Sequence, residues 1–438
     1  MIPIANRPLI SYQLEFLESA GFEEVIVVAS TGRNHDAVGT FLAEAYRGKL
    51  KAILLAFDPS FGSAELLVKL RERLVTDFIV VSGDLVVAEP RQFLHRLADT
   101  HRTKSAAITA LAYRARADPI ESAPPPPPPA GKRGGRGSKK ADAADGGRAA
   151  ADEPRAGAAA PPPPLVYLGI AAPNSRLVMY VNAEDVDEDD EEIALRKGLL
   201  RQVPRLSIRS DLVDAHLYIV SHWTLSLLPD IVRKGMVSLQ ADLLPILVRG
   251  QFIRSWRERA AEILRNDPRT LYDGSADTEL DTIKCFVHVL DDAHYCRRVQ
   301  TLDDFITVNR DVALHAGRTG FRPAIALTQN NFVDPNATVD PQAVVRADCV
   351  VGAGVAIGAG SVIQNSNIGV HCKIGANVTI TNSVLLDHVT IEEGTKITNS
   401  ILCSSSFVRA KCSLVSCTLG VSYDLRAASE IKDLRLAK

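Results

Sequence analysis

Few residues of this chain have the type and spacing that a catalytic or metal-binding site requires. Asp84 follows an apolar run, DFIVV, and lies in a Ser-Gly-Asp-Leu segment where a strand is expected to end. A carboxylate in that place suits a divalent cation, but such a cation needs several oxygen ligands. A lone aspartate can equally cap the end of a strand. Asp84 by itself therefore leaves both interpretations open.

Two histidines, His371 and His388, are the other candidates for chemistry, because a hexapeptide acyltransferase would need a catalytic histidine on its coil. We expect each to face solvent or to pack on a neighbour, since such enzymes lack a large α/β domain ahead of the coil. The sequence contains no serine elbow, phosphate loop, dinucleotide loop or zinc-protease motif. Its Gly352-Ala353-Gly354 segment lies in a repeat where glycines form corners.

The cysteines form neither a metal-binding nor a disulfide pattern. There are seven of them, without a C-x-x-C pair, and most fall within the C-terminal repeat. A buried cysteine in a repeat behaves as a small hydrophobic residue. We therefore expect reduced packing residues at all of these positions: Cys285, Cys296, Cys349, Cys372, Cys403, Cys412 and Cys417.

The repeat that contains both histidines spans residues 333–419. Aliphatic residues first recur every six positions, so that three sixes make one coil, and from Ile363 onward each coil consists of two sixes and a five. A fixed period is typical of a solenoid, in which each short strand stacks on its copy in the next coil. A β-sandwich would instead require alternation of period two. The sequence predicts a parallel β-helix with two inward columns: Ile363, Ile380, Ile397 and Leu414, and Ile368, Leu385, Leu402 and Leu419.

Asparagines support the same register. Asn365, Asn382 and Asn399 recur once in each shortened coil, at the same interval as the aliphatic columns, and a serine follows each of them. Asparagine tolerates a positive φ better than most residues. We therefore expect these asparagines at a corner of the coil.

Residues 1–115 alternate between helical and strand-like segments. Helices are expected at residues 8–20 and 63–74, and strands at 24–29, 77–81 and 105–112. Continuous apolar strands separated by helices are typical of a mostly parallel sheet that is covered on both faces. Helix and strand patterns resume at residues 205–220 and continue to about residue 310.

Composition excludes several classes of partner. The formal net charge is −2 over 438 residues, so no overall field favours nucleic acid or an anionic membrane. The N-terminus lacks a signal-peptide pattern, and no stretch of 18 apolar residues follows. We expect a soluble, intracellular protein that binds neither nucleic acid nor a membrane.

Two segments have biased composition. Residues 118–164 include two proline runs around a stretch rich in Gly, Ala, Lys and Arg, and too few apolar residues to offset the entropy of ordering. Its basic residues could contact RNA, but no aromatic platform is interleaved. We interpret it as a solvated insertion, and the acidic residues 184–192 as a mobile loop.

An α/β domain followed by a hexapeptide solenoid resembles the sugar-nucleotide pyrophosphorylase family. The segment 3–10, PIANRPLI, is similar to that family's P-x-x-N-[KR]-P-[LI] segment. Likewise, Gly62-Ser63-Ala64 is similar to its G-T-A and Gly83-Asp84 to its metal-binding G-D. Nucleotidyl transfer needs phosphates held by backbone N–H groups and a divalent ion held by carboxylates.

Three departures from the family pattern argue against catalysis. The family's glycine-rich loop and its lysine precede the P-x-x-N segment, within which this sequence begins. Arg298 aligns with the second metal-binding aspartate, and a guanidinium repels Mg²⁺. Asp214-Ala215-His216 replaces the sugar-contacting N-A-G. We therefore expect no catalytic residues, metal or cofactor, with Gly62 and Asp84 as vestigial remnants.

Longer segments resemble one branch of this family, the gamma subunits of eukaryotic translation initiation factor 2B. They are residues 208–218 (IRSDLVDAHLY), 238–251 (SLQADLLPILVRGQ), 295–302 (YCRRVQTL) and the N-S-x-[LIV] motif of the coils. The sister epsilon subunit shares both domains and adds a C-terminal helical-repeat domain that performs nucleotide exchange. The resemblance implies a non-catalytic subunit that pairs with epsilon and joins alpha, beta and delta subunits. Its substrate GTPase would be translation initiation factor 2, in the cytosol.

The alternative function is a mannose-1-phosphate guanylyltransferase-like enzyme, which a carboxylate at position 298 would favour. With the resemblance, we expect a nucleotidyltransferase-like Rossmann-type domain over residues 1–322 and a left-handed β-helix over residues 330–424. A C-terminal tail is expected at residues 425–438. If the family's first strand is missing, its two neighbours in the sheet should each lack one partner.

Overall fold

A computed structural model describes residues 2–87, 90–114, 166–183, 197–203, 205–232, 238–266, 282–292, 294–315, 331–346 and 348–436. The insertion at 118–164 and the acidic segment 184–192 lie outside these residues. No helix in the described part has the length and apolar character needed to cross a membrane.

The N-terminal part begins with a short hairpin of β1 (Pro3–Ile4) and β2 (Arg7–Pro8). Helix α1 (Leu9–Ser19) buries Leu9, Leu14 and Leu17 and leads into β3 (Glu24–Ser30), close to the helix and strand expected from the sequence. Strand β3 pairs in parallel with β4 (Lys51–Phe57). The remaining helices of this part are α2 (Arg33–Thr40), the π-helical η1 (Phe41–Ala45) and α3 (Ser63–Leu70).

A larger mixed sheet forms the centre of the α/β domain, in the order β10-β8-β9-β12-β7-β11-β5. Strands β5, β7, β8 and β12 run in one direction, and an antiparallel strand separates most of them. The bounds are β5 (Phe78–Val81), β7 (Ile108–Arg114), β8 (Val166–Ala171), β9 (Arg176–Asn182), β10 (Leu206–Arg209), β11 (Leu212–Val220) and β12 (Cys285–Val289).

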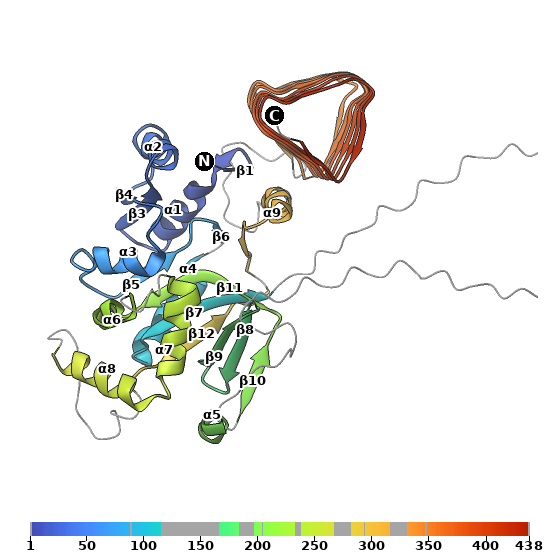
Figure 1. Ribbon diagram of the computed structural model, residues 1–438. Coiled ribbons are helices and arrows are strands. Elements are labelled where there is room, and N and C mark those ends of the chain that lie inside the picture. Colours follow the sequence, from blue (N-terminus) through green and yellow to red (C-terminus); the bar gives the residue numbers. More distant parts are fainter. Residues whose placement is uncertain are drawn as a thin grey trace, which may run out of the picture.

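Helices cover this sheet on both faces (Figure 1). One core packs the sheet against helices α6 and α7, and a second packs it against α1 and α4. Burial on both sides explains the continuous apolar strands of the sequence. The helices are α4 (Pro90–Thr103), α5 (Lys197–Gln202), η3 (His222–Ser226), α6 (Leu228–Val232), η4 (Leu239–Leu243), α7 (Leu244–Gly250), α8 (Arg254–Asn266) and α9 (Leu302–His315).

Several edge strands of the domain, among them β3 and β5, have a single described neighbour. Among the described strands, β3 pairs only with β4, and β5 pairs only with β11. Strand β6 (Leu85–Val87) leaves the sheet and pairs with β13 (Cys296–Arg298) in a separate antiparallel ribbon. This ribbon carries the chain toward α9, which lies between the α/β domain and the solenoid (Figure 1).

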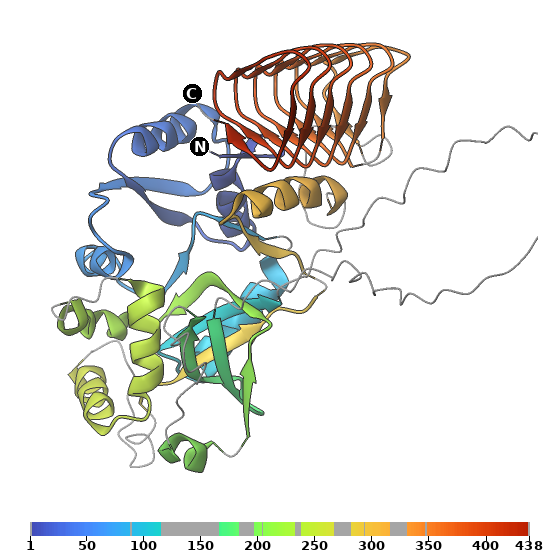
Figure 2. The ribbon, with the colours of Figure 1, turned by 45° about the vertical axis from the view of Figure 1, so that its right-hand side comes forward.

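The C-terminal part is a solenoid of triangular cross-section (Figure 1) whose coils are stacked on one another (Figure 2), with a parallel sheet on each of three sides. Sheet F contains β14 (Phe332–Val333), β17 (Val350–Val351), β20 (Asn367–Ile368), β23 (Val384–Leu385), β26 (Ile401–Leu402), β29 (Thr418–Leu419) and β32 (Arg435–Leu436). Sheet G contains β15 (Thr338–Val339), β18 (Ala356–Ile357), β21 (Lys373–Ile374), β24 (Thr390–Ile391), β27 (Phe407–Val408) and β30 (Asp424–Leu425). Sheet H contains β16 (Val344–Val345), β19 (Val362–Gln364), β22 (Thr379–Thr381), β25 (Lys396–Thr398), β28 (Ser413–Val415) and β31 (Glu430–Lys432).

The register predicted from the repeat is confirmed. Ile363 pairs with Ile380, which pairs with Ile397, and the side chains are fully buried. The second column is in register as well. The asparagines take the expected corner conformation, with φ of 48°, 49° and 50° at Asn365, Asn382 and Asn399.

The solenoid extends beyond the boundary expected from the sequence. Strands β31 and β32 lie within the predicted tail, residues 425–438, and pair with β28 and β29 of the preceding coil. Their aliphatic residues, Ile431 and Leu436, pack against the core of the solenoid. The last coil has a described neighbour on one side only, so its residues are more exposed. Because fewer of them are buried, the apolar repeat is weaker here.

Candidate functional site

Asp84, the candidate metal ligand, forms an ion pair with Arg298. Asp84 lies in the turn between β5 and β6, and Arg298 ends β13, which pairs with β6. Arg298 Nη2 lies 2.8 Å from Asp84 Oδ2, and Nε lies 3.2 and 3.3 Å from the two carboxylate oxygens. The side chain of Arg298 is 8% exposed and that of Asp84 is 25% exposed. The guanidinium thus binds the carboxylate that a divalent cation would need.

Other groups engage Arg298 further. The Gln300 amide oxygen, in the orientation that satisfies both side chains, accepts hydrogen bonds from Arg298 Nη1 at 3.1 Å and Nη2 at 2.9 Å. The backbone N–H of Arg298 donates to the Tyr113 hydroxyl at 3.2 Å. Charge-assisted, two-point contacts of this kind hold a guanidinium in one orientation.

Next to this pair, the buried carboxylate of Asp214 collects three donors. The hydroxyls of Tyr180 and Tyr218 donate to Oδ2 at 2.8 and 2.6 Å, and the backbone N–H of His216 donates to Oδ1 at 2.9 Å. Burial, reinforced by the Asp214 charge, raises the pKa of both tyrosines. The two phenols therefore stay protonated and act as donors.

His216 occupies the position where the related family has a glycine. Its φ is +50°, at a bulge where the pairing of β11 with β7 shifts register. Burial lowers the pKa of His216, which favours a neutral imidazole. The charges of Arg298 and Asp84 act on the histidine in opposite directions, Arg298 lowering its pKa and Asp84 raising it.

The Gly62-Ser63-Ala64 segment begins helix α3. The Ser63 hydroxyl accepts a hydrogen bond from the backbone N–H of Leu239 at 2.8 Å, and the N–H of Gly62 donates to Glu65 Oε2 at 2.9 Å. These contacts satisfy polar groups within the fold. The segment that resembles a phosphate-binding element thus joins α3 to η4.

Asn6, from the segment that resembles P-x-x-N, contacts the solenoid. Its Nδ2 donates to the carbonyl of Ile368 at 2.8 Å. The tip of the β1–β2 hairpin therefore lies against a solenoid coil.

His371 and His388 stack on one corner of the solenoid. Both are exposed, and their ring centroids lie 5.3 Å apart at an interplanar angle of 14°. This agrees with the expectation that they face solvent or pack on a neighbour. Within the described residues, no three His, Cys, Asp or Glu side chains cluster as a metal site would require.

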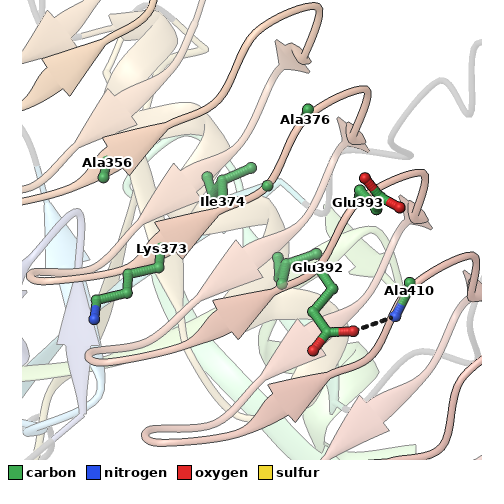
Figure 3. Close-up of a pocket in the computed structure, with 9 residues that line it drawn as sticks. Ala356, Lys373, Ile374, Ala376, Glu392, Glu393 and Ala410 are labelled. Carbon is green, nitrogen blue, oxygen red and sulfur yellow. Dashed lines mark hydrogen bonds between the residues drawn. The ribbon is translucent and has the colours of Figure 1, made fainter.

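A shallow groove of about 590 Å³ lies on sheet G and its adjoining corner (Figure 3). Small residues form much of its lining, with Lys373 toward one end and Glu392 and Glu393 toward the other. Glu392 Oε2 accepts a hydrogen bond from the backbone N–H of Ala410 at 2.9 Å. This carboxylate therefore links two neighbouring coils.

The cysteines are free thiols. Cys372 and Cys412 each donate from Sγ to a carbonyl of the next coil at 3.1 Å. Burial raises the pKa of Cys349 and Cys372 to about 11. The prediction of buried packing cysteines is confirmed at Cys285, Cys349, Cys372, Cys412 and Cys417, whereas Cys296 and Cys403 are only partly buried.

Sequence reasoning missed several residues of these networks, among them Gln300 and Asn309. Asn309 is 1% exposed and links α9 to the solenoid through hydrogen bonds. A signal was available for it, because an asparagine in the middle of an apolar helical stretch needs buried partners. Those partners, Ala5 and Asn367, lie 304 and 58 positions away in the chain, so the pattern could not identify them.

Three similarities to known proteins agree with this architecture. Residues 328–431 match a family model described as the EIF2B subunit epsilon LbH domain, a left-handed β-helix. The chain is 30% identical over 395 residues to translation initiation factor eIF2B subunit gamma of Dictyostelium discoideum, covering 85% of this chain and 82% of that protein. It is 27% identical over 320 residues to the subunit of the same name from Schizosaccharomyces pombe, covering 72% of this chain and 60% of that protein.

The family model covers the solenoid, whereas the alignment with the Dictyostelium protein extends over most of both domains. This agreement fits the motifs of both domains that the sequence shares with gamma subunits. The chain belongs to the family of eIF2B gamma subunits, regulatory components of the translation initiation factor 2B exchange complex.

Proposed function

We propose that this chain is a non-catalytic gamma subunit that pairs with the epsilon subunit to promote GDP/GTP exchange on translation initiation factor 2 in the cytosol. The pair would join alpha, beta and delta subunits in the complete factor. The observation that carries the proposal is the ion pair between Arg298 and Asp84, in a chain that belongs to this family.

The ion pair argues against catalysis because the positive charge of Arg298 opposes the binding of a divalent cation. A nucleotidyl transfer site needs carboxylates free to hold a divalent cation beside the phosphates. Here the Asp84 carboxylate is already bound by a guanidinium that Gln300 also holds. A cation at this position would have to displace Arg298 and tolerate its positive charge nearby. Gly62 and Asp84 are therefore remnants of a nucleotidyltransferase site, now used in the structure of the domain.

A nucleotide-exchange assay tests the regulatory role. Release of labelled GDP from translation initiation factor 2 is measured with this chain alone, with epsilon alone and with both. We expect no acceleration by the chain alone and faster release when it is added to epsilon. A subunit pair of standard size buries about 1,600 Å² or more, so it should survive moderate salt. Release catalysed by this chain alone, or failure to bind epsilon, would refute the proposal.

The alternative, a mannose-1-phosphate guanylyltransferase-like enzyme, is tested separately. The pure chain is incubated with GTP, Mg²⁺ and mannose-1-phosphate, and pyrophosphate is measured. We expect no pyrophosphate above background. Turnover that the Asp84→Asn variant abolishes would establish the enzyme instead.

A further inference from the structure

The hairpin of β1 and β2 ends in a tight two-residue turn that faces the solenoid. Both turn residues have positive φ, 46° at Ala5 and 62° at Asn6, as expected for a type I′ turn. The backbone N–H of Ala5 and the side chain of Asn6 are thereby directed out of the hairpin, and both have partners outside it.

Asn309 of α9 is the centre of a three-way junction. Its Oδ1 accepts hydrogen bonds from the backbone N–H of Ala5 and from Nδ2 of Asn367, each at 2.8 Å. Its own Nδ2 donates to the carbonyl of Phe305 at 2.8 Å. One buried amide therefore joins the hairpin, α9 and strand β20 of the solenoid.

The Asn6 side chain makes a second link to the same coils. Nδ2 donates to the carbonyl of Ile368, the residue after Asn367. A glycine occupies the nearby position 352, and a Cβ there would come within 3.0 Å of Asn6 Nδ2 and 2.9 Å of the Gly369 backbone. The absence of a side chain at Gly352 therefore lets the hairpin tip approach the coil.

Apolar contacts surround these hydrogen bonds. Ile4 of the hairpin and Val308 of α9 are fully buried in one cluster with Val384 and Ile401 of sheet F. The Tyr12 hydroxyl donates to the carbonyl of Ile4 at 2.8 Å. An unpaired amide costs more free energy in a dry environment than in water. Loosening one contact of the junction would leave several polar groups unpaired together.

We propose that the Ala5–Asn6 hairpin tip and Asn309 form an interdomain latch that holds the solenoid at one fixed angle on the α/β domain. The segment that resembles a nucleotidyltransferase signature thus has a mechanical role in this chain. Asn6, Asn309 and Asn367 are positioning residues: they make the two domains move as one body. The proposal does not depend on the partners proposed above, because it concerns the chain by itself.

The test measures the distance between the two domains in the full-length chain. Spin labels are attached through unnatural amino acids at Glu44 and Lys396, both exposed, and their separation is measured by double electron–electron resonance. We expect one narrow distribution for the wild type. The Asn6→Gly/Asn309→Ala double variant should give a distribution at least twice as broad, with unchanged helix and strand content by circular dichroism.

Asn34→Ala is the matched control, since Asn34 is exposed and its amide donates to Ser30 within the α/β domain. It should leave the distribution narrow. A narrow, unshifted distribution in the folded double variant would overturn the latch.

A milder variant, Asn6→Gly, tests the latch if the double variant does not fold. Asn6→Gly removes only the amide, because glycine readily adopts the positive φ of that position. Hydrogen–deuterium exchange then follows the backbone N–H of Ala5, which Asn309 binds. We expect exchange at least tenfold faster than in the wild type. An unchanged exchange rate would mean that Asn6 does not support the junction, and the latch would be rejected.

Discussion

The solenoid consists of parallel sheets and the α/β domain of a mixed sheet, and the two obtain their order in different ways. Each coil of the solenoid repeats the bonds of the preceding coil: the backbone N–H of Ser383 donates to Ser366 Oγ, and that of Ser400 to Ser383 Oγ, each at 3.2 Å. In the α/β domain, the central polar contact joins Asp84 to Arg298, 214 positions later.

The two regions should therefore differ in how well they tolerate substitutions. A substitution in a repeated column of the solenoid affects the two neighbouring coils, but each coil uses only local contacts. The polar centre of the α/β domain has no second copy, so one substitution there leaves specific partners without a bond. Four substitutions test this contrast, in order of decreasing effect on stability.

Ile380→Asp should be the most damaging change. Ile380 is fully buried between Ile363 and Ile397, so an aspartate there would place an unpaired carboxylate in the solenoid core. We expect a loss of about 4 kcal/mol or more in the free energy of unfolding, or failure to fold. Thermal and urea unfolding provide the measurement.

The control is Thr379→Asp on the same strand, where the side chain is exposed. It should lower the melting temperature only slightly. Similar melting temperatures for the two variants would mean that Ile380 does not point inward.

Arg298→Met tests the ion pair of the α/β domain. It leaves the partly buried Asp84 carboxylate without its guanidinium, and removing one member of a buried pair typically costs about 3 kcal/mol or more. Urea unfolding at neutral pH measures the loss. The Asp84→Asn/Arg298→Met double variant removes the stranded charge and should recover much of the stability. A double variant less stable than Arg298→Met would show that the unpaired charge of Asp84 does not cause the loss of stability.

His101 gives the α/β domain a dependence on pH that the solenoid column does not share. The imidazole is 2% exposed, with Nδ1 at 2.9 Å from Thr109 Oγ1 and Nε2 at 3.0 Å from Ser221 Oγ. Ser221 donates to the carbonyl of Ala106, so its oxygen accepts a hydrogen bond from Nε2–H of the ring. Burial lowers the pKa of His101 to about 4, against the attraction of Asp77.

Since the pKa of histidine in the unfolded chain is near 6.5, the unfolded state binds the extra proton between pH 6.5 and 4. The stabilisation is complete above pH 6.5 and is lost as the pH falls toward 4. We expect this residue to account for about 2 kcal/mol of lost stability between pH 7.5 and pH 5. His101→Gln should remove that part of the pH dependence. An identical slope in the variant would contradict the assignment.

Glu392→Ala should have the smallest effect. It removes one hydrogen bond between coils, to the N–H of Ala410, at a site with access to water, where the net cost is about 1 kcal/mol or less. Differential scanning calorimetry can measure the shift. The neighbouring Glu393→Ala, at an exposed position, serves as the control. A larger loss than for Arg298→Met would reverse the contrast between the polar contacts of the two domains.

The sequence alone determined the solenoid, because a repeat encodes its own contacts. Once Ile363 and Ile380 were known to be one coil apart, the pairing partner and burial of each followed from the period. The last coil was missed because its residues Ile431 and Leu436 have weaker burial at the end of the stack. The sequence also singled out Asp84 and Arg298, but only by alignment with family motifs and not as partners of each other.

Only the tertiary structure decided what these residues do. Nothing local in the sequence indicates that Gln300 would hold the guanidinium, that two tyrosines would donate to Asp214, or that Asn309 would join the hairpin to β20. Such contacts depend on how the strands and helices pack, because hydrogen bonds form over about 3 Å. Asn309 and its partners Ala5 and Asn367 lie 304 and 58 positions apart, and even the nearby pairs meet only where the folded backbone brings their side chains together. A repeat places its partners at a fixed separation along the chain, whereas a single packed domain specifies each contact once.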